Sequence, residues 1–265
     1  MEENKKVWIT GIGVIILIVA VVAIYYLFFQ GKTKEAAQAE EVVEAKPVES
    51  VEEEKSLEGL PVEPLDVALD ESDSVIRDLI KGLSSHPKLA DWAVTTDFVR
   101  KFVAAVDNVA NGQSPRAQLD FFRREGNFKV VEKSGRIYID PSSYSRYNQV
   151  AEAFASLDTE GIVRLLRQSK LMIQEAYRDL GYPDQDFQDT LVRAIRELLR
   201  VPVVKDVLVQ KKVVSYEMVD PNLEKLSQAQ KHLLRMGPEN VQKIQSKLRE
   251  LALALGVSSS KLPSG

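Results

Sequence analysis

The strongest constraint on this chain is an uninterrupted apolar run near its start. Residues 7–29 read VWITGIGVIILIVAVVAIYYLFF and contain no charged side chain. As a helix, this run covers roughly 34 Å, slightly more than the ~30 Å hydrocarbon core of a bilayer. Trp8 lies near one end and Tyr25 and Tyr26 near the other, where aromatic rings favour the lipid–water boundary. The sequence therefore predicts a short N-terminal tail, residues 1–6, followed by one transmembrane helix.

A cleaved secretory signal is the competing interpretation of this run. Signal peptides carry about 7–15 apolar residues followed by a small-residue cleavage site, whereas this run is longer and ends in Leu27-Phe28-Phe29-Gln30. An uncleaved anchor is therefore favoured. Two lysines on each side of the span give no preferred orientation. The short tail ahead of a first and only span is the usual signal-anchor arrangement, so we expect the large C-terminal part to be exported.

An acidic segment follows the predicted span. Between Glu35 and Asp66 the chain has eleven acidic residues against two lysines, and it has no aromatic residue. Such a composition cannot bury enough apolar surface to fold, so residues 30–68 are predicted to be a disordered acidic linker. The linker is either a spacer that lets the domain reach a partner away from the bilayer or a passive tether, and the sequence leaves both open.

The remaining residues, 69–256, are long enough for a compact domain, with a frayed tail predicted over residues 257–265. From Asp70 to Gly256 there are 28 Lys and Arg against 26 Asp and Glu, which argues against a nucleic-acid partner. Cysteine is absent, so disulfides, thiol catalysis and cysteine metal sites are excluded. Apolar periodicity predicts a mainly α domain with one or two short β-hairpins (α+β).

Local signals place the predicted elements. Asp70 or Ser72 caps a first helix, and Thr96 opens a second that ends at Asn111-Gly112. A hairpin pairs residues 128–131 with 137–139 around Gly135, and a less distinct extended pair spans residues 203–209 and 213–218.

Further helices are expected from the same kind of signal. Asp140-Pro141 starts one, a long helix runs from Asp158 to Gly181, and Asp186 caps another. Residues 221–256 form two helices divided at Gly237-Pro238. The apolar seam of the last helix follows heptad spacing and is either core or an exposed partner surface; core packing is favoured because only two heptads are present.

No catalytic, cofactor or metal site is predicted. The chain has only two histidines, His86 and His232, and although Ser84-Ser85 precede the first, neighbouring residues in a turn rarely form a nucleophile and base. Three aspartates between residues 184 and 189 do not fit a calcium loop, which requires a glycine at its sixth and a glutamate at its twelfth position. Phosphate-binding glycine motifs are also absent.

Two stretches combine aromatic and guanidinium groups beside the first hairpin, FFRR at 121–124 and YSRY at 144–147. These residue types are enriched in binding hot spots. The predicted binding residues are Arg123, Arg124, Tyr144, Arg146 and Tyr147. The alternative is that the rings are core and the arginine stems cover them.

The resemblance to a known family rests on the stretches YSRY (144–147), AYRDLG (176–181) and LLRMGPEN (233–240). These stretches resemble the signature of a bacterial family of membrane-anchored proteins catalogued as domain of unknown function 3014. The resemblance implies a Gram-negative envelope location and supplies no catalytic residues.

Together these observations predict a single-pass protein of the cell inner membrane with its domain in the periplasm. We expect it to be a structural or protein-interaction module that contacts the membrane through residues 7–29 and binds another envelope protein. The alternatives are a periplasmic enzyme acting on a cell-wall polymer or peptide and a small-ligand sensor. An enzyme requires a deep pocket with convergent carboxylates or His86, whereas an adaptor requires a shallow apolar or aromatic patch.

Overall fold

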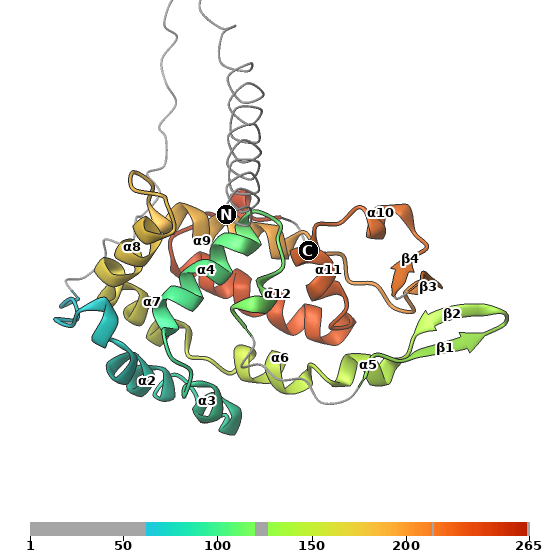
Figure 1. Cartoon of the computed structure of the whole chain (residues 1–265), viewed down its shortest axis with the longest axis horizontal. Coiled ribbons are helices and arrows are strands. Elements are labelled where there is room, and N and C mark those ends of the chain that lie inside the picture. Colours follow the sequence, from blue (N-terminus) through green and yellow to red (C-terminus); the bar gives the residue numbers. More distant parts are fainter. Residues whose placement is uncertain (1–61, 120–126, 214, 264–265) are drawn as a thin grey trace, which may run out of the picture. The chain divides into compact units, whose positions relative to one another are not determined.

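A computed structural model describes residues 62–119, 127–213 and 215–263. The described part is mainly helical and carries one small antiparallel sheet (Figure 1), which confirms the predicted α+β class. None of the helices in this part is long and apolar enough to cross a membrane. The predicted span at residues 7–29 and most of the predicted linker lie outside the described residues.

Most of the helices lie where the apolar periodicity predicted them. In chain order the α-helices are α2 (Asp73–Lys81), α3 (Pro87–Trp92), α4 (Phe98–Ala110), α5 (Pro141–Ser145), α6 (Asn148–Ala155), α7 (Thr159–Gln168), α8 (Lys170–Asp179), α9 (Phe187–Leu199), α10 (Pro221–Glu224), α11 (Gln228–Leu234) and α12 (Pro238–Ala254). Three short 3-10 turns are η2 (Leu69–Glu71), η3 (Pro115–Ala117) and η4 (Ser259–Lys261). Asp140 and Asp186 cap α5 and α9 as predicted, accepting the amides of Ser142 at 2.7 Å and Gln188 at 2.8 Å.

The two predicted hairpins join into a single sheet of order β1-β2-β3-β4. Its strands are β1 (Val130–Lys133), β2 (Arg136–Ile139), β3 (Leu208–Lys211) and β4 (Tyr216–Met218). Ser134 and Gly135 form the first turn with φ of 52° and 72°, which agrees with the predicted glycine turn. Ile137 pairs with Val209, so both hairpin tips lie at the same end of the sheet.

The main core lies between this sheet and helices α6, α7, α9 and α12. From the sheet it takes Ile139, Val209 and Met218. From α12 it takes the seam that the heptad spacing identified, whose members Val241, Ile244, Leu248, Leu251 and Leu255 are all buried. Core packing is thus the correct interpretation of that seam.

A second core joins α2, α3, α4 and α8. The predicted single helix from Asp158 to Gly181 is wrong, because the chain breaks at Ser169 into α7 and α8. The amide of Leu65 donates to the carbonyl of Gln168 at 3.0 Å, so the entering chain uses an acceptor at the break. The sequence around Ser169 gives no local signal for this tertiary contact.

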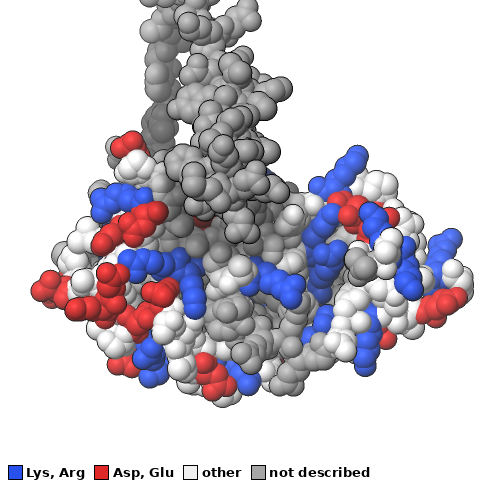
Figure 2. Space-filling view, in the orientation of Figure 1, with Lys and Arg blue, Asp and Glu red and all other residues white. Residues whose placement is uncertain are grey.

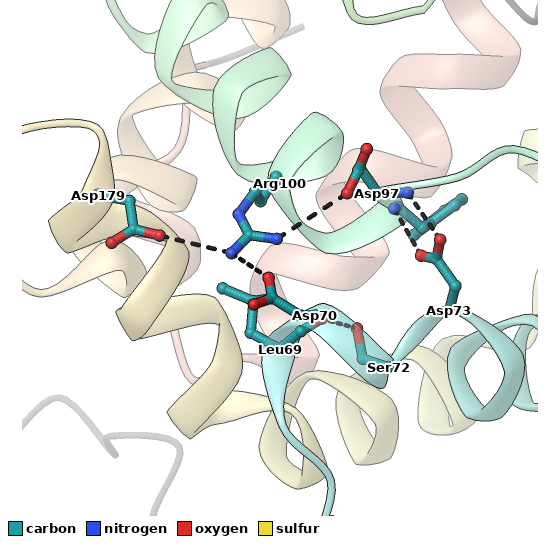
Figure 3. Close-up of polar contacts among 8 residues, drawn as sticks. Leu69, Asp70, Ser72, Asp73, Asp97, Arg100 and Asp179 are labelled. Atoms are coloured by element: carbon teal, nitrogen blue, oxygen red, sulfur yellow. Dashed lines mark hydrogen bonds and ion pairs between the residues drawn. The ribbon is translucent and has the colours of Figure 1, made fainter.

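Two groups of polar contacts, one around Arg100 and one around Asp73, join the elements around the second core (Figure 3). Arg100 on α4 contacts Asp70 at 2.7 Å, Asp179 at 3.7 Å and Asp97 at 3.9 Å. Its hydrogen bond to Asp70 is the main reason that the pKa of Arg100 is raised. Asp73 accepts the amides of Asp97 and Phe98 and thereby caps α4 from another helix, a role that the sequence had assigned to Thr96.

The ends of the folded part differ from the predicted boundaries. The predicted frayed tail is wrong through residue 263, since Val257 and Leu262 are buried in the main core and Arg249 donates to the carbonyl of Pro263 at 2.8 Å. At the other end, Leu65 packs against the second core, so the folded part includes residues that the sequence assigned to the linker.

The C-terminal region contains three helices instead of the predicted two. Ser227 begins α11 with a capping box, because its hydroxyl accepts the amide of Gln230 at 3.1 Å and the Gln230 side chain accepts the amide of Ser227 at 3.1 Å. This reciprocal signal separates α10 from α11.

Candidate interaction surface

Arg146 lies beside two aromatic rings near the first hairpin. Its guanidinium carbon is 5.4 Å from the ring centre of Tyr147 and 6.0 Å from that of Phe128. The Arg146 Nε donates to the carbonyl of Ser143 at 3.0 Å, which fixes the guanidinium next to the rings. At these distances the positive charge is attracted to the faces of the rings.

Phe128 extends this group to the far side of the sheet. Its ring lies 5.7 Å from that of Tyr216, although they flank opposite edge strands, β1 and β4. Phe128 lies two residues before β1 and is 37% exposed. We call Phe128, Arg146, Tyr147 and Tyr216 the aromatic–arginine surface.

The structure gives Tyr144 a different position from the other predicted binding residues. Its ring packs against the main core and lies under Gly237, where an added Cβ would come within 2.4 Å of the Tyr144 Cγ. Asn240, which is 2% exposed, donates through its Nδ2 to the Tyr144 carbonyl at 3.1 Å and to Asn148 at 3.0 Å. The α5 segment that carries Arg146 is therefore held against the start of α12.

The Tyr144 hydroxyl lies in a poorly solvated position. It is buried and has no hydrogen bond of normal geometry. Burial, with a smaller contribution from the negative charge of Asp206, raises the pKa of Tyr144 to about 12, while the nearby backbone of Val207 opposes the shift. This tyrosine is a supporting residue beneath the surface.

Of the predicted binding residues, Arg146 and Tyr147 lie in the aromatic–arginine surface, and Tyr144 lies beneath it. Arg123 and Arg124 lie outside the described residues. Phe128 and Tyr216 were not predicted. Phe128 lies two residues before β1 and Tyr216 lies in β4, so their contact becomes evident only once the two hairpins are known to pair.

An open groove of about 500 Å³ runs along α12. Lys247, which is 9% exposed, lies in its wall and donates to the Leu157 carbonyl at 2.9 Å, to the Thr159 hydroxyl at 3.0 Å and to Glu250 at 2.8 Å. Glu250 also accepts from Thr159, and these two partners lower the pKa of Glu250, Lys247 being the larger cause. All three ammonium hydrogens have acceptors, so the cluster joins α12 to the start of α7 and offers no uncommitted base.

The histidines have structural contacts. His86 caps α3, its Nδ1 accepting the amide of Lys88 at 3.3 Å, and Ser84 contacts Ser156 at 2.7 Å. His232 lies 3.2 Å from the hydroxyl of Ser114. Across residues 62–119, 127–213 and 215–263, no group of three or more His, Asp or Glu side chains is placed to hold a metal ion.

Comparison with known proteins gives one match. A family model described as "Protein of unknown function (DUF3014)" matches residues 98–252, which is more than half of the chain. No curated protein matches this sequence. No solved structure matches it either.

Proposed function

The chain belongs to the DUF3014 family, and from its own residues we propose that it is a single-pass protein of the bacterial inner membrane whose periplasmic domain binds another envelope protein. The anchor is the uncharged run at residues 7–29. A sequence without cysteine is compatible with an oxidising compartment.

The observation that carries the binding role is the aromatic–arginine surface. It combines a fixed guanidinium with aromatic rings, the side chains that most often dominate binding energy at protein interfaces. Phe128 is partly exposed at 37%, so its ring has apolar area left for a partner to cover. The charge of Arg146 favours a partner segment that presents a carboxylate beside an apolar side chain.

The groove along α12 supports an interaction role over catalysis. The side chains that line the groove include Lys247 and Glu250, which form an ion pair with each other. Neither His86 nor His232 lines the groove. An enzyme site normally holds titratable groups that are free to exchange protons with a substrate.

Photo-crosslinking in cells tests the binding role. A photo-reactive amino acid at position 128 should capture a specific envelope protein, and Arg146→Ala should abolish the capture. A photo-reactive residue at position 171 is the control, because Leu171 on α8 is more exposed, at 67%, yet lies outside the surface. Equal capture from both positions would refute the assignment of the surface.

The stability of the variants separates binding from folding. Arg146→Ala removes the hydrogen bond to the Ser143 carbonyl and should lower the free energy of unfolding by only ~0–1 kcal/mol. Arg164→Ala, a change of an exposed arginine on α7, is the matched control for the loss of charge. A strongly destabilised Arg146→Ala protein that still captures the partner would show that Arg146 is structural.

Fusion reporters test the orientation separately. An alkaline phosphatase fused at the C-terminus should be active, because that enzyme requires the oxidising periplasm. A β-galactosidase fusion at the same point should be inactive. The reverse pattern would place the domain in the cytoplasm and overturn this part of the proposal.

A further inference from the structure

Charge is distributed unevenly over the folded domain. The segments that carry the sheet with α5, α10 and α11, residues 127–147 and 200–236, contain eleven Lys and Arg against six Asp and Glu. The segments that carry α2, α3, α4 and α8, residues 62–119 and 170–189, contain eight Lys and Arg against fourteen Asp and Glu. Figure 2 shows Lys and Arg projecting from the side with the sheet and Asp and Glu gathered on the side with α2 and α8. An anionic surface therefore attracts the sheet side and repels the other.

The sheet side also exposes apolar side chains. Of the eight exposed large hydrophobic residues in the described part of the chain, four lie there. They are Phe128, Val203, Val213 and Val219. Val213 is the extreme case, with 98% of its surface in water at the end of the β3–β4 hairpin, directly after Lys211 and Lys212.

The sheet register brings further cations to that end. Because β2 and β3 are antiparallel with Ile137 opposite Val209, the β1–β2 turn lies beside the β3–β4 turn. Arg136 and Lys133 flank the first turn. The acidic side chains near the tips are Glu132, Asp206, which contacts Lys133 at 3.7 Å, and Glu217, which pairs with Lys212.

We propose that the two hairpin tips contact the surface of an anionic phospholipid bilayer, with Val213 entering the headgroup layer and Arg136, Lys211 and Lys212 contacting lipid phosphates. Basic side chains next to an exposed apolar residue are suited to this boundary, since the cations meet phosphates while the apolar group leaves water. The bilayer is the one that the predicted anchor enters. A coil of 32 residues, the length of the stretch 30–61, spans ~32 Å, so a linker of this kind would let the domain reach the surface of that membrane.

Fluorescent labelling tests this proposal without background, because the chain has no cysteine. The full chain carrying Val213→Cys is labelled with an environment-sensitive fluorophore and reconstituted into vesicles of phosphatidylcholine alone or with added phosphatidylglycerol. The emission should shift to the blue only with phosphatidylglycerol. The shift should vanish in about 1 M salt, where the Debye length falls to about 3 Å.

Two variants control for position and charge. Val94→Cys places the same probe at another exposed valine, 66% exposed and on the acidic side, and should show no shift. Arg136→Gln, Lys211→Gln and Lys212→Gln, introduced together with the probe at position 213, should abolish the shift, whereas Lys81→Gln and Lys88→Gln should leave it unchanged. No shift with phosphatidylglycerol, an equal shift at both probe positions, or a shift that resists the charge changes would each overturn the proposal.

Two further measurements separate the contact of the tips from the predicted anchor and from the protein partner. Flotation of the chain with phosphatidylcholine vesicles reports on the anchor alone. A shift at position 213 that requires added envelope protein instead of anionic lipid would assign the tips to a protein partner and refute the lipid contact.

Discussion

Gly237 lies directly against the ring of Tyr144, so closely that a Cβ at position 237 would be 2.4 Å from the Tyr144 Cγ. Both residues belong to stretches that identify the family resemblance, YSRY and LLRMGPEN. The contact joins these two distant stretches, because one supplies the ring and the other the missing side chain. It also positions Arg146 in the aromatic–arginine surface.

Gly237→Ala should therefore be strongly destabilising. Gly237 has φ of 89° and ψ of 160°, a conformation that suits only glycine, and the added methyl also overlaps the ring. We expect a loss of ~2–5 kcal/mol in the free energy of unfolding, measured by urea denaturation. Gly181→Ala is the matched control: its φ is 101°, but nothing lies within 4 Å of the new Cβ, so it should lose only ~1–2 kcal/mol. Equal losses would show that the Tyr144 contact is unimportant.

Asp73→Ala should destabilise the second core by removing the cap of α4. The carboxylate accepts the amide of Asp97 at 2.8 Å and that of Phe98 at 3.0 Å (Figure 3). Losing a cap costs ~1–2 kcal/mol, which a chemical denaturation curve can resolve. Asp78→Ala on the same helix removes only an exposed contact with Lys81 and should cost less than ~0.5 kcal/mol. A similar cost for both changes would argue that the cap adds nothing.

The contrast between Asp73 and Asp186 shows what the sequence could predict. Asp186 caps its own helix two residues away, so local spacing was sufficient. Asp73 caps a helix that begins 25 residues later, and only the tertiary fold brings them together. The break between α7 and α8 at Ser169 could not be predicted for the same reason, because the contact made there is a hydrogen bond from the distant Leu65 amide.

The residues of the candidate surface also divide into those that the sequence could predict and those that it could not. Arg146 and Tyr147 are adjacent in sequence, so a residue-type argument finds them together. Phe128 and Tyr216 belong to different hairpins that pair into one sheet, and each hairpin alone does not specify its neighbour. Tyrosine is a residue type typical of binding surfaces, which is why the sequence predicted a binding role for Tyr144. Its supporting role depends on its contact with Gly237 at the start of α12.

The folded domain should require residues that lie within the predicted linker. Leu65 packs on the second core and its amide donates to Gln168 at 3.0 Å. A chain starting at Val62 should therefore be more stable than one starting at Leu69, by ~1–3 kcal/mol from lost apolar burial and the lost hydrogen bond. Thermal denaturation of both fragments measures this. Leu65→Ala in the longer fragment should reproduce most of the loss of stability. Identical melting temperatures for the two fragments would show that the folded domain begins at residue 69.

Tyr144 should make the fold sensitive to alkaline pH. Its pKa is raised to about 12 in the folded chain, whereas an unfolded tyrosine has a pKa of about 10. The unfolded chain therefore loses this proton first, so the contribution is fully present below about pH 10 and is lost as the pH rises toward about 12. Tyr144→Phe should reduce this alkaline loss.

At neutral pH the same substitution should leave stability unchanged or slightly raised, because the buried hydroxyl that it removes has no hydrogen bond of normal geometry. Urea denaturation at neutral pH and at a series of alkaline pH values measures both effects. Asp206→Asn provides an independent check, since it removes a charge that raises the Tyr144 pKa and should also weaken the pH dependence. Tyr182 has a raised pKa as well, caused first by Asp107, so Tyr182→Phe should remove a separate part of the alkaline loss. An alkaline profile that Tyr144→Phe leaves unchanged would show that the Tyr144 hydroxyl is accessible to water.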